Sequence, residues 1–220
     1  VAGVSPAPRS SSCQRETLLS DLQMRPLGAP EVSSLRNVLA FGVLSHVLDL
    51  ITTDFRDPQL SHEGNPFYLF AEHLGYGGWP FLVVTKVLVV GVLGVAFWWY
   101  LGIRHHYLPD KVVRSPRSLI WYGMWDRKPY PKSLWARLFN RRKFKYLGVV
   151  LAGLALPASG AAALFISVDN VMFGLGRPLP LPLAGRLLLL TIALVFVWWY
   201  WAYWHYYKRL VRLGVIRNGG

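Results

Sequence analysis

The sequence predicts an all-α integral membrane protein: four transmembrane helices that form two similarly oriented helical hairpins, with both termini cytoplasmic. Three observations carry this prediction. The chain contains four apolar stretches of about twenty residues each, its basic residues gather in alternate connections, and one residue pattern recurs after a hundred positions. Of the 220 residues, 53% are hydrophobic and 15% aromatic, and the net charge is +13. A soluble domain of this size has no need for four such stretches.

The apolar stretches are residues 35–55, 80–101, 147–168 and 185–206. At ~1.5 Å per helical residue each is ~30 Å long, the thickness of the hydrocarbon layer. We therefore expect a multi-pass protein of the inner (cytoplasmic) membrane. The chain then divides into a disordered or partner-bound segment (1–34), a first hairpin (35–101), a basic, aromatic interfacial loop (102–146), a second hairpin (147–207) and a basic tail (208–220).

The distribution of charge predicts the orientation. The loop at 102–146 carries twelve basic residues, whereas the connection after the first stretch carries Arg56 against Asp54, Asp57, Glu63 and Glu72. Basic residues favour the cytoplasmic side, which puts both termini inside and both short connections outside. The net charge thus reports topology and attraction to anionic lipid headgroups, and it does not require nucleic-acid binding.

One pattern occurs twice, with a constant offset of 100 residues. Its matched positions are Pro80 and Pro180, Lys86 and Arg186, Trp98 and Trp198, Trp99 and Trp199, Tyr100 and Tyr200, His105 and His205, and Tyr107 and Tyr207. We interpret the match as an internal duplication. Trp and Tyr clusters at helix ends are typical of the membrane interface, where an apolar ring lies beside a polar N–H or O–H group.

A cofactor is the alternative explanation of these aromatic clusters. A pigment, haem or quinone could lie among the rings, with His105 and His205 as axial ligands. Both histidines follow the Trp clusters and stand beside Arg104 and Lys208, where we expect water to reach them. This position favours the interfacial belt, and the sequence requires no cofactor.

Buried acids in the apolar stretches predict ion pairs. His46 and Asp49 share one helical face, and an ionised Asp within the hydrocarbon needs a partner. Lys86 lies at a similar depth, ~9 Å from the outer end of its helix. Arg186 is the matched cation of the second hairpin, and Asp169 is its nearest acid. We therefore predict two equivalent pairs, Asp49–Lys86 and Asp169–Arg186.

The outer side carries a polar cluster with several chemical interpretations. One is a metal or hydrolytic site formed from His46, Asp49, His62, Glu63 and His73. The chain has no close ligand spacing, Gly-rich phosphate loop, nucleophile elbow or Cys pair to support catalysis. In a structural interpretation, Glu63 and Asn65 instead cap and orient the loop before a short helix at 66–74. A proton or ion path through Asp49 is the third possibility.

The motifs of this region also resemble a known group of proteins. The run Leu-Asp-Leu-Ile-Thr-Thr at 48–53, Glu-Gly-Asn-Pro at 63–66, and Lys86 in the next apolar stretch resemble a family of small, uncharacterised prokaryotic integral membrane proteins. The family pattern is Asp-x-x-Thr, Glu-x-Asn-Pro and Lys, and the resemblance covers about residues 44–101. It implies a helical membrane domain with a polar cluster on its outer side, and no particular reaction.

The absence of a catalytic motif favours a non-enzymatic role. Together with the aromatic surface and the basic loop, it predicts an accessory or assembly subunit of a larger membrane complex, such as a respiratory or photosynthetic one. The expected partners are the lipid bilayer and other membrane subunits. The alternative is a small membrane enzyme or ion-coupled protein that uses the outer Asp/His/Glu cluster.

Overall fold

The computed structural model describes residues 29–60, 66–109, 112–125 and 141–216, and every element in these ranges is a helix. Four helices are long and apolar enough to cross a membrane: α2 (Ala29–Arg56), α4 (Trp79–Ile103), α7 (Arg141–Gly174) and α8 (Leu181–Arg212). Three short helices accompany them: α3 (Pro66–His73), η1 (Arg104–Tyr107) and α5 (Pro116–Trp125). The predictions of an all-α chain and of four apolar helices long enough to span a membrane are confirmed.

The helix bounds extend beyond the apolar stretches. α7 begins at Arg141, and α8 continues to Arg212, because basic residues limit a hydrocarbon span without interrupting a helix. Pro157 lies inside α7, which continues on both sides of it. The predicted short helix at 66–74 corresponds to α3, which is followed by Gly75 with a φ of 83°, a helix-terminating conformation that glycine adopts without strain.

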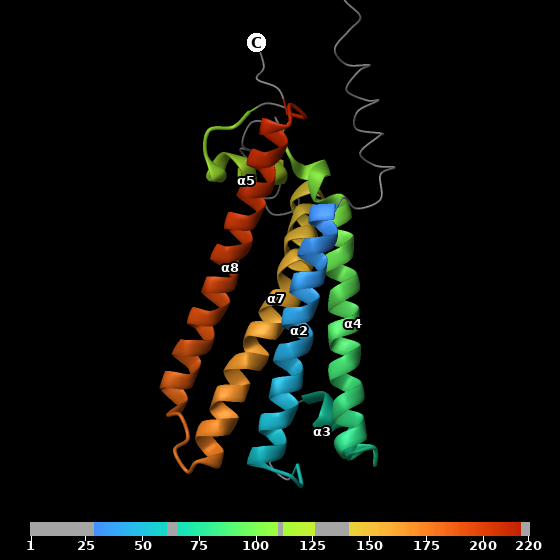
Figure 1. Cartoon of the computed structure of the whole chain (residues 1–220), viewed down its shortest axis with the longest axis vertical. Coiled ribbons are helices and arrows are strands. Elements are labelled where there is room, and N and C mark those ends of the chain that lie inside the picture. Colours follow the sequence, from blue (N-terminus) through green and yellow to red (C-terminus); the bar gives the residue numbers. More distant parts are fainter. Residues whose placement is uncertain (1–28, 61–65, 110–111, 126–140, 217–220) are drawn as a thin grey trace, which may run out of the picture.

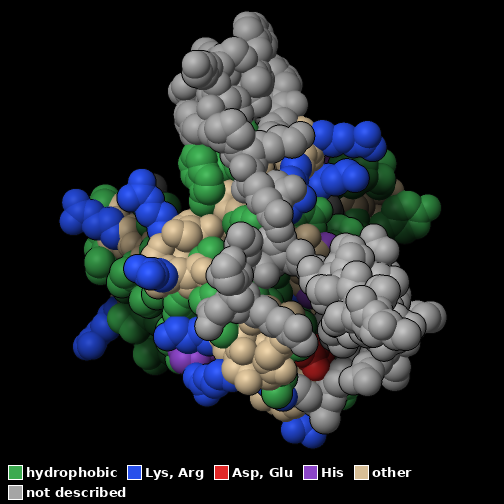
Figure 2. Space-filling view, turned by 90° about the horizontal axis from the view of Figure 1, so that it is seen from above, with side chains coloured by type: hydrophobic (Ala, Val, Ile, Leu, Met, Phe, Trp, Pro, Cys, Tyr) green, Lys and Arg blue, Asp and Glu red, His purple; other side chains and the backbone are tan. Residues whose placement is uncertain are grey.

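The four long helices form an elongated bundle (Figure 1). The start of α2, the end of α8, η1 and α5 lie at one end, and α3 and the α7–α8 connection lie at the other (Figure 1). We call the first the basic end, because the described exposed cations there include Arg36, Arg114, Arg117, Arg141, Lys145, Lys208, Arg209 and Arg212. Figure 2 looks onto this end and shows Lys and Arg side chains at several places around it.

α7 is the central helix of the bundle. It packs most extensively on α2 and also contacts α4, α8 and α5. Glycines permit the close approach: a Cβ added at Gly160 would lie 2.7 Å from the Phe41 ring and 3.4 Å from the Gly42 Cα. A Cβ added at Gly153 would lie 2.7 Å from Trp199 Nε1 and 2.9 Å from the Tyr100 ring. Tyr100 of α4 and Trp199 of α8 thus pack against a glycine of α7.

The aromatic residues near the basic end differ in how far they are exposed. Tyr100, Trp199 and Tyr203 are buried, and the Trp199 and Tyr203 rings stack with centroids 5.4 Å apart. Trp98, Trp99, Trp198 and Trp201 are exposed. The interpretation of the aromatic clusters as an interfacial belt is therefore wrong for Tyr100 and Trp199, which lie in the contact between α7 and its neighbours. For the exposed rings it stays a prediction.

Candidate functional site

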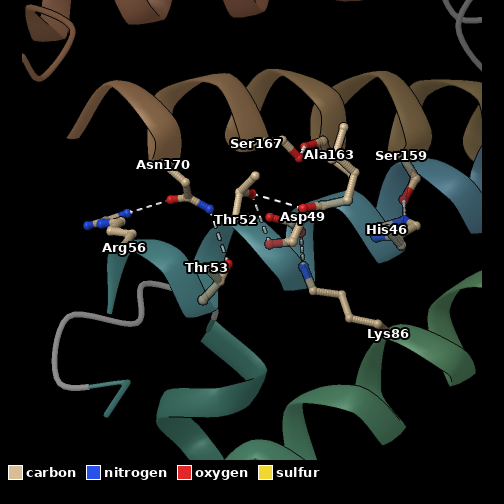
Figure 3. Close-up of polar contacts among 11 residues, drawn as sticks. His46, Asp49, Thr52, Thr53, Arg56, Lys86, Ser159, Ala163, Ser167 and Asn170 are labelled. Atoms are coloured by element: carbon tan, nitrogen blue, oxygen red, sulfur yellow. Dashed lines mark hydrogen bonds and ion pairs between the residues drawn. The ribbon is translucent and has the colours of Figure 1, made fainter. Parts of the chain in front are cut away.

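Polar side chains line one face of α2 over its second half. They are Ser45, His46, Asp49, Thr52, Thr53 and Arg56, and all except the half-buried Arg56 are buried. The spacing of three and four residues keeps them on one side of the helix, toward α7 and α4. Together with Lys86 of α4 and Ser159, Ser167 and Asn170 of α7 they form what we call the polar seam (Figure 3). The seam extends ~16 Å along α2.

An ion pair occupies the centre of the polar seam. Lys86 Nζ lies 2.5 Å from Asp49 Oδ2, and the side chains are 17% and 2% exposed (Figure 3). The structure thus contains the first predicted pair, in which antiparallel neighbours bring an acid and a base together at one depth. Removal of either partner would leave an uncompensated charge in a medium of low dielectric constant.

His46 connects α2 to α7. Its Nε2 lies 2.9 Å from Ser159 Oγ, so the hydroxyl and the ring share one hydrogen bond (Figure 3). The other ring nitrogen, Nδ1, is buried and has no hydrogen-bond partner among the described residues. His46 lies one turn from Asp49 on α2 and is therefore the titratable group nearest to the ion pair along that helix.

An amide links the two helices at the end of the seam. Arg56 Nη1 donates a hydrogen bond to Asn170 Oδ1 at 2.9 Å, and Asn170 Nδ2 donates to Thr53 Oγ1 at 3.1 Å (Figure 3). The Arg56 guanidinium also lies 4.5 Å from the Phe173 ring centroid. Sequence reasoning missed the contacts of Asn170 and Ser159; the available signal was that both are polar side chains within the apolar part of α7.

The hydroxyl groups of the seam bond mainly to their own helices. Thr52 Oγ1 donates to the carbonyls of Leu48 and Asp49 at 3.0 and 3.1 Å. Ser45 donates to Phe41 O at 2.7 Å, and Ser167 to Ala163 O at 2.8 Å. Such bonds to the preceding turn satisfy a hydroxyl in an apolar medium. Most polar groups of the seam thus have partners within the chain.

The structure describes only part of the predicted metal or hydrolytic cluster. His46 and Asp49 belong to the seam and His73 ends α3, whereas His62, Glu63 and the capping residue Asn65 lie outside the described residues. Within the described ranges, no group of three or more His, Cys, Asp or Glu side chains is arranged to hold a metal ion.

The second predicted ion pair is absent from the described part of the chain. No ion pair within 4.0 Å joins Asp169 to Arg186, and Arg186 is exposed. The half-buried side chains of this part of α8 are Ala184, Leu187, Leu188 and Thr191, which share one face at helical spacing. Arg186 lies on the other side of the helix. The prediction was wrong because equal depth does not determine which way a side chain points.

The two candidate axial histidines have different surroundings. His105 is in η1, with its ring centroid 4.1 Å from that of His106, whereas His205 is exposed on α8, 4.2 Å from the Trp201 ring. The sequence predicts that water reaches both histidines, but His105 is half-buried and the neighbouring Arg104 is buried. Its guanidinium forms a 3.5 Å ion pair with Glu31 and lies 3.6 Å from the Tyr206 ring centroid. The contacts of Arg104 therefore link the start of α2 to the ends of α4 and α8.

The chain was compared with known proteins at the level of family models, curated sequences and solved structures, and none matches. The resemblance over residues 44–101 stays a prediction.

Proposed function

We propose that the chain is a non-enzymatic accessory or assembly subunit of a larger membrane complex. In this proposal it is inserted in a prokaryotic inner membrane as two helical hairpins, with its basic end on the cytoplasmic side. The observation that carries the proposal is the incomplete packing of α8. A small membrane protein that leaves one helix largely uncovered has surface available for a neighbouring subunit.

The burial of the four long helices differs widely. In the most apolar part of each, 44% of the residues are buried in α7, 28% in α2 and 17% in α4, but 6% in α8. No residue of α8 from 182 to 198 is buried. Lipid covers some exposed apolar surface of any membrane protein, but over this length α8 has only one half-buried face and is otherwise exposed.

The state of the polar seam supports a structural role for these residues. Its ion pair, its amide and its hydroxyls are engaged with one another or with the backbone. A catalytic centre needs groups that can turn toward a substrate, and a metal site needs convergent free ligands. The seam instead holds α2 against α7 and α4.

The charge distribution supports the orientation. Exposed cations gather at the basic end, whereas Asp54, Asp57 and Glu72 lie toward the other. By the tendency of Lys and Arg to stay in the cytoplasm, the basic end faces inward. The Asp/Thr and Lys motif residues then lie in the outer half, as the resemblance to the uncharacterised prokaryotic family implies.

Site-specific photo-crosslinking in native membranes tests the proposal. A photoreactive residue is placed at Leu189 of α8 or at Leu88 of α4, positions that are 68% and 61% exposed. We expect one defined protein adduct from position 189, confirmed by the reciprocal crosslink from that protein, and lipid adducts alone from position 88. Lipid adducts at both positions in the intact membrane would contradict the accessory-subunit proposal.

One observation favours the alternative of an ion-coupled protein. The buried Nδ1 of His46 has no described partner and lies near a buried acid and base. In this alternative the His46, Asp49 and Lys86 side chains exchange protons. Proton flux into liposomes containing the purified protein would support it if the Asp49→Asn variant abolished that flux; wild-type liposomes as proton-tight as empty ones would exclude it.

A further inference from the structure

The two matched helices offer corresponding faces to different surroundings. On α4, the residues that pack toward α2 and α7 include Leu82, Lys86, Val90, Leu93 and Phe97, which are buried or half-buried. An offset of 100 residues leads to Pro182, Arg186, Leu190, Ala193 and Val197 of α8. All five of these are exposed. We call them the open face of α8.

The open face contains a cation within an apolar helix. Arg186 lies five residues from the start of α8, ~7.5 Å along the axis, between the exposed Pro182 and Leu190. The described residues form no ion pair with it. An unpaired charge at this depth in the membrane is energetically unfavourable unless an anion pairs with it. Arg186 is therefore a candidate recognition residue.

The matched cation on α4 shows what such a position can bind. Lys86 pairs with Asp49, a carboxylate on a neighbouring membrane-spanning helix at the same depth. α2 supplies that helix for α4, and α2 and α8 make at most minor contact within the chain. What the open face lacks is therefore a helix in the place that α2 occupies beside α4.

We propose that the open face of α8 docks a transmembrane helix of a different membrane protein, and that this helix carries an Asp or Glu that pairs with Arg186. The inference rests on the proposed function and adds the chemistry of the partner. The carboxylate lies about one and a half turns from the outer end of its helix, since both proteins share one bilayer and ion-pair partners must lie at one depth. Apolar residues of the partner cover Leu190 and Val197.

A second copy of this chain fits the open face poorly. Copies in one membrane have the same orientation, so two α8 helices in contact would bring their Arg186 side chains together at one depth. Asp49, the buried acid at this depth, is already engaged with Lys86. α8 itself carries no acid, and Asp169 of α7 is half-buried, so we assign the charge complement of Arg186 to another protein.

The test uses full-length protein in native membranes, with the photoreactive residue at Leu189 and substitutions at Arg186. Arg186→Gln should reduce the yield of the protein adduct by about tenfold or more, because a desolvated carboxylate on the partner loses its cation. Arg186→Lys should keep most of the yield. Arg177→Gln, which neutralises an exposed cation of the α7–α8 connection, is the matched control and should leave the yield unchanged.

Reciprocal substitution identifies the carboxylate. Arg186→Asp should abolish the adduct, and an acid-to-Arg change at one position of the crosslinked partner should restore it. An Arg186→Gln variant with an undiminished adduct would overturn this inference while leaving the accessory-subunit proposal intact. A self-adduct, or a lipid adduct that depends on Arg186, would also overturn it, since the guanidinium would then bind a second copy or a phosphate headgroup. If the photoreactive residue at position 189 forms no protein adduct when Arg186 is intact, the proposed function itself is refuted.

Discussion

α4 and α8 have matched residues at a constant offset but are packed differently. α4 lies against both α2 and α7, and its cation is joined to Asp49. α8 is held chiefly in the third nearest the basic end, where Trp199, Tyr203 and Tyr207 are buried, and the rest of its length has no buried residue. Similar sequence therefore does not give similar surroundings, because the neighbours decide which face of a helix becomes core.

The largest difference in stability is expected between substitutions of the two matched cations, Lys86 of α4 and Arg186 of α8. Lys86→Ala should lower the free energy of unfolding by about 4 kcal/mol, because it leaves the Asp49 carboxylate buried and unpaired. Arg186→Ala, the matched change, should alter the stability of the isolated protein by less than about 0.5 kcal/mol. Unfolding of both variants in mixed micelles measures the difference.

A double variant separates charge from packing in the same comparison. Asp49→Leu combined with Lys86→Met should recover most of the stability lost in Lys86→Ala, because two apolar side chains of similar size remove the unpaired charge. If the double variant is no more stable than Lys86→Ala, the Asp49–Lys86 pair stabilises the fold by more than the neutralisation of two charges.

A slightly smaller effect is expected where the matched tryptophans differ. Trp199→Ala should cost about 3 kcal/mol, because it opens a cavity between α7 and α8. Trp99, the matched residue, is 50% exposed, and Trp99→Ala should cost less than about 1 kcal/mol. Equal losses from the two substitutions would show that both rings are covered, for instance by a partner of α4.

Gly153 links the two matched helices, since an added Cβ would meet both Trp199 and Tyr100. Gly153→Ala should destabilise the bundle by about 2 kcal/mol through overpacking. Gly148→Ala, on the same helix with open space around the new Cβ, should be neutral or stabilising by up to about 1 kcal/mol. Thermal unfolding in detergent compares the two variants directly.

The smallest effect concerns the hydrogen bonds that hold α2, the helix that α8 lacks as a neighbour. Asn170→Ala removes the amide between Arg56 and Thr53 and should cost about 1 kcal/mol. Asn37→Ala, at an exposed position of α2, should cost only a few tenths of a kcal/mol. A loss above about 3 kcal/mol at Asn170 would indicate that the whole seam opens together.

The sequence predicts the elements of this fold better than their contacts. Hydropathy and length identify the four long helices, and charge with depth identifies the Asp49–Lys86 pair, because both depend on position along a helix. The Asp169–Arg186 pair failed because rotation about the helix axis depends on the neighbouring helices. The same reason hid the contacts of His46 with Ser159 and of Asn170 with Thr53, whose partners are more than a hundred residues apart.

The separation of seam partners along the chain has a consequence for biosynthesis. Of the four long helices, α2 leaves the ribosome first, yet Lys86 follows Asp49 by 37 residues, and Ser159 follows His46 by 113. At about 5–20 residues per second, roughly 6 to 20 s pass between the synthesis of His46 and of Ser159. During that interval the polar side of α2 must stay in water, in the insertion machinery or beside a membrane chaperone. Among these four helices, the one made first is thus among the last to become compatible with lipid.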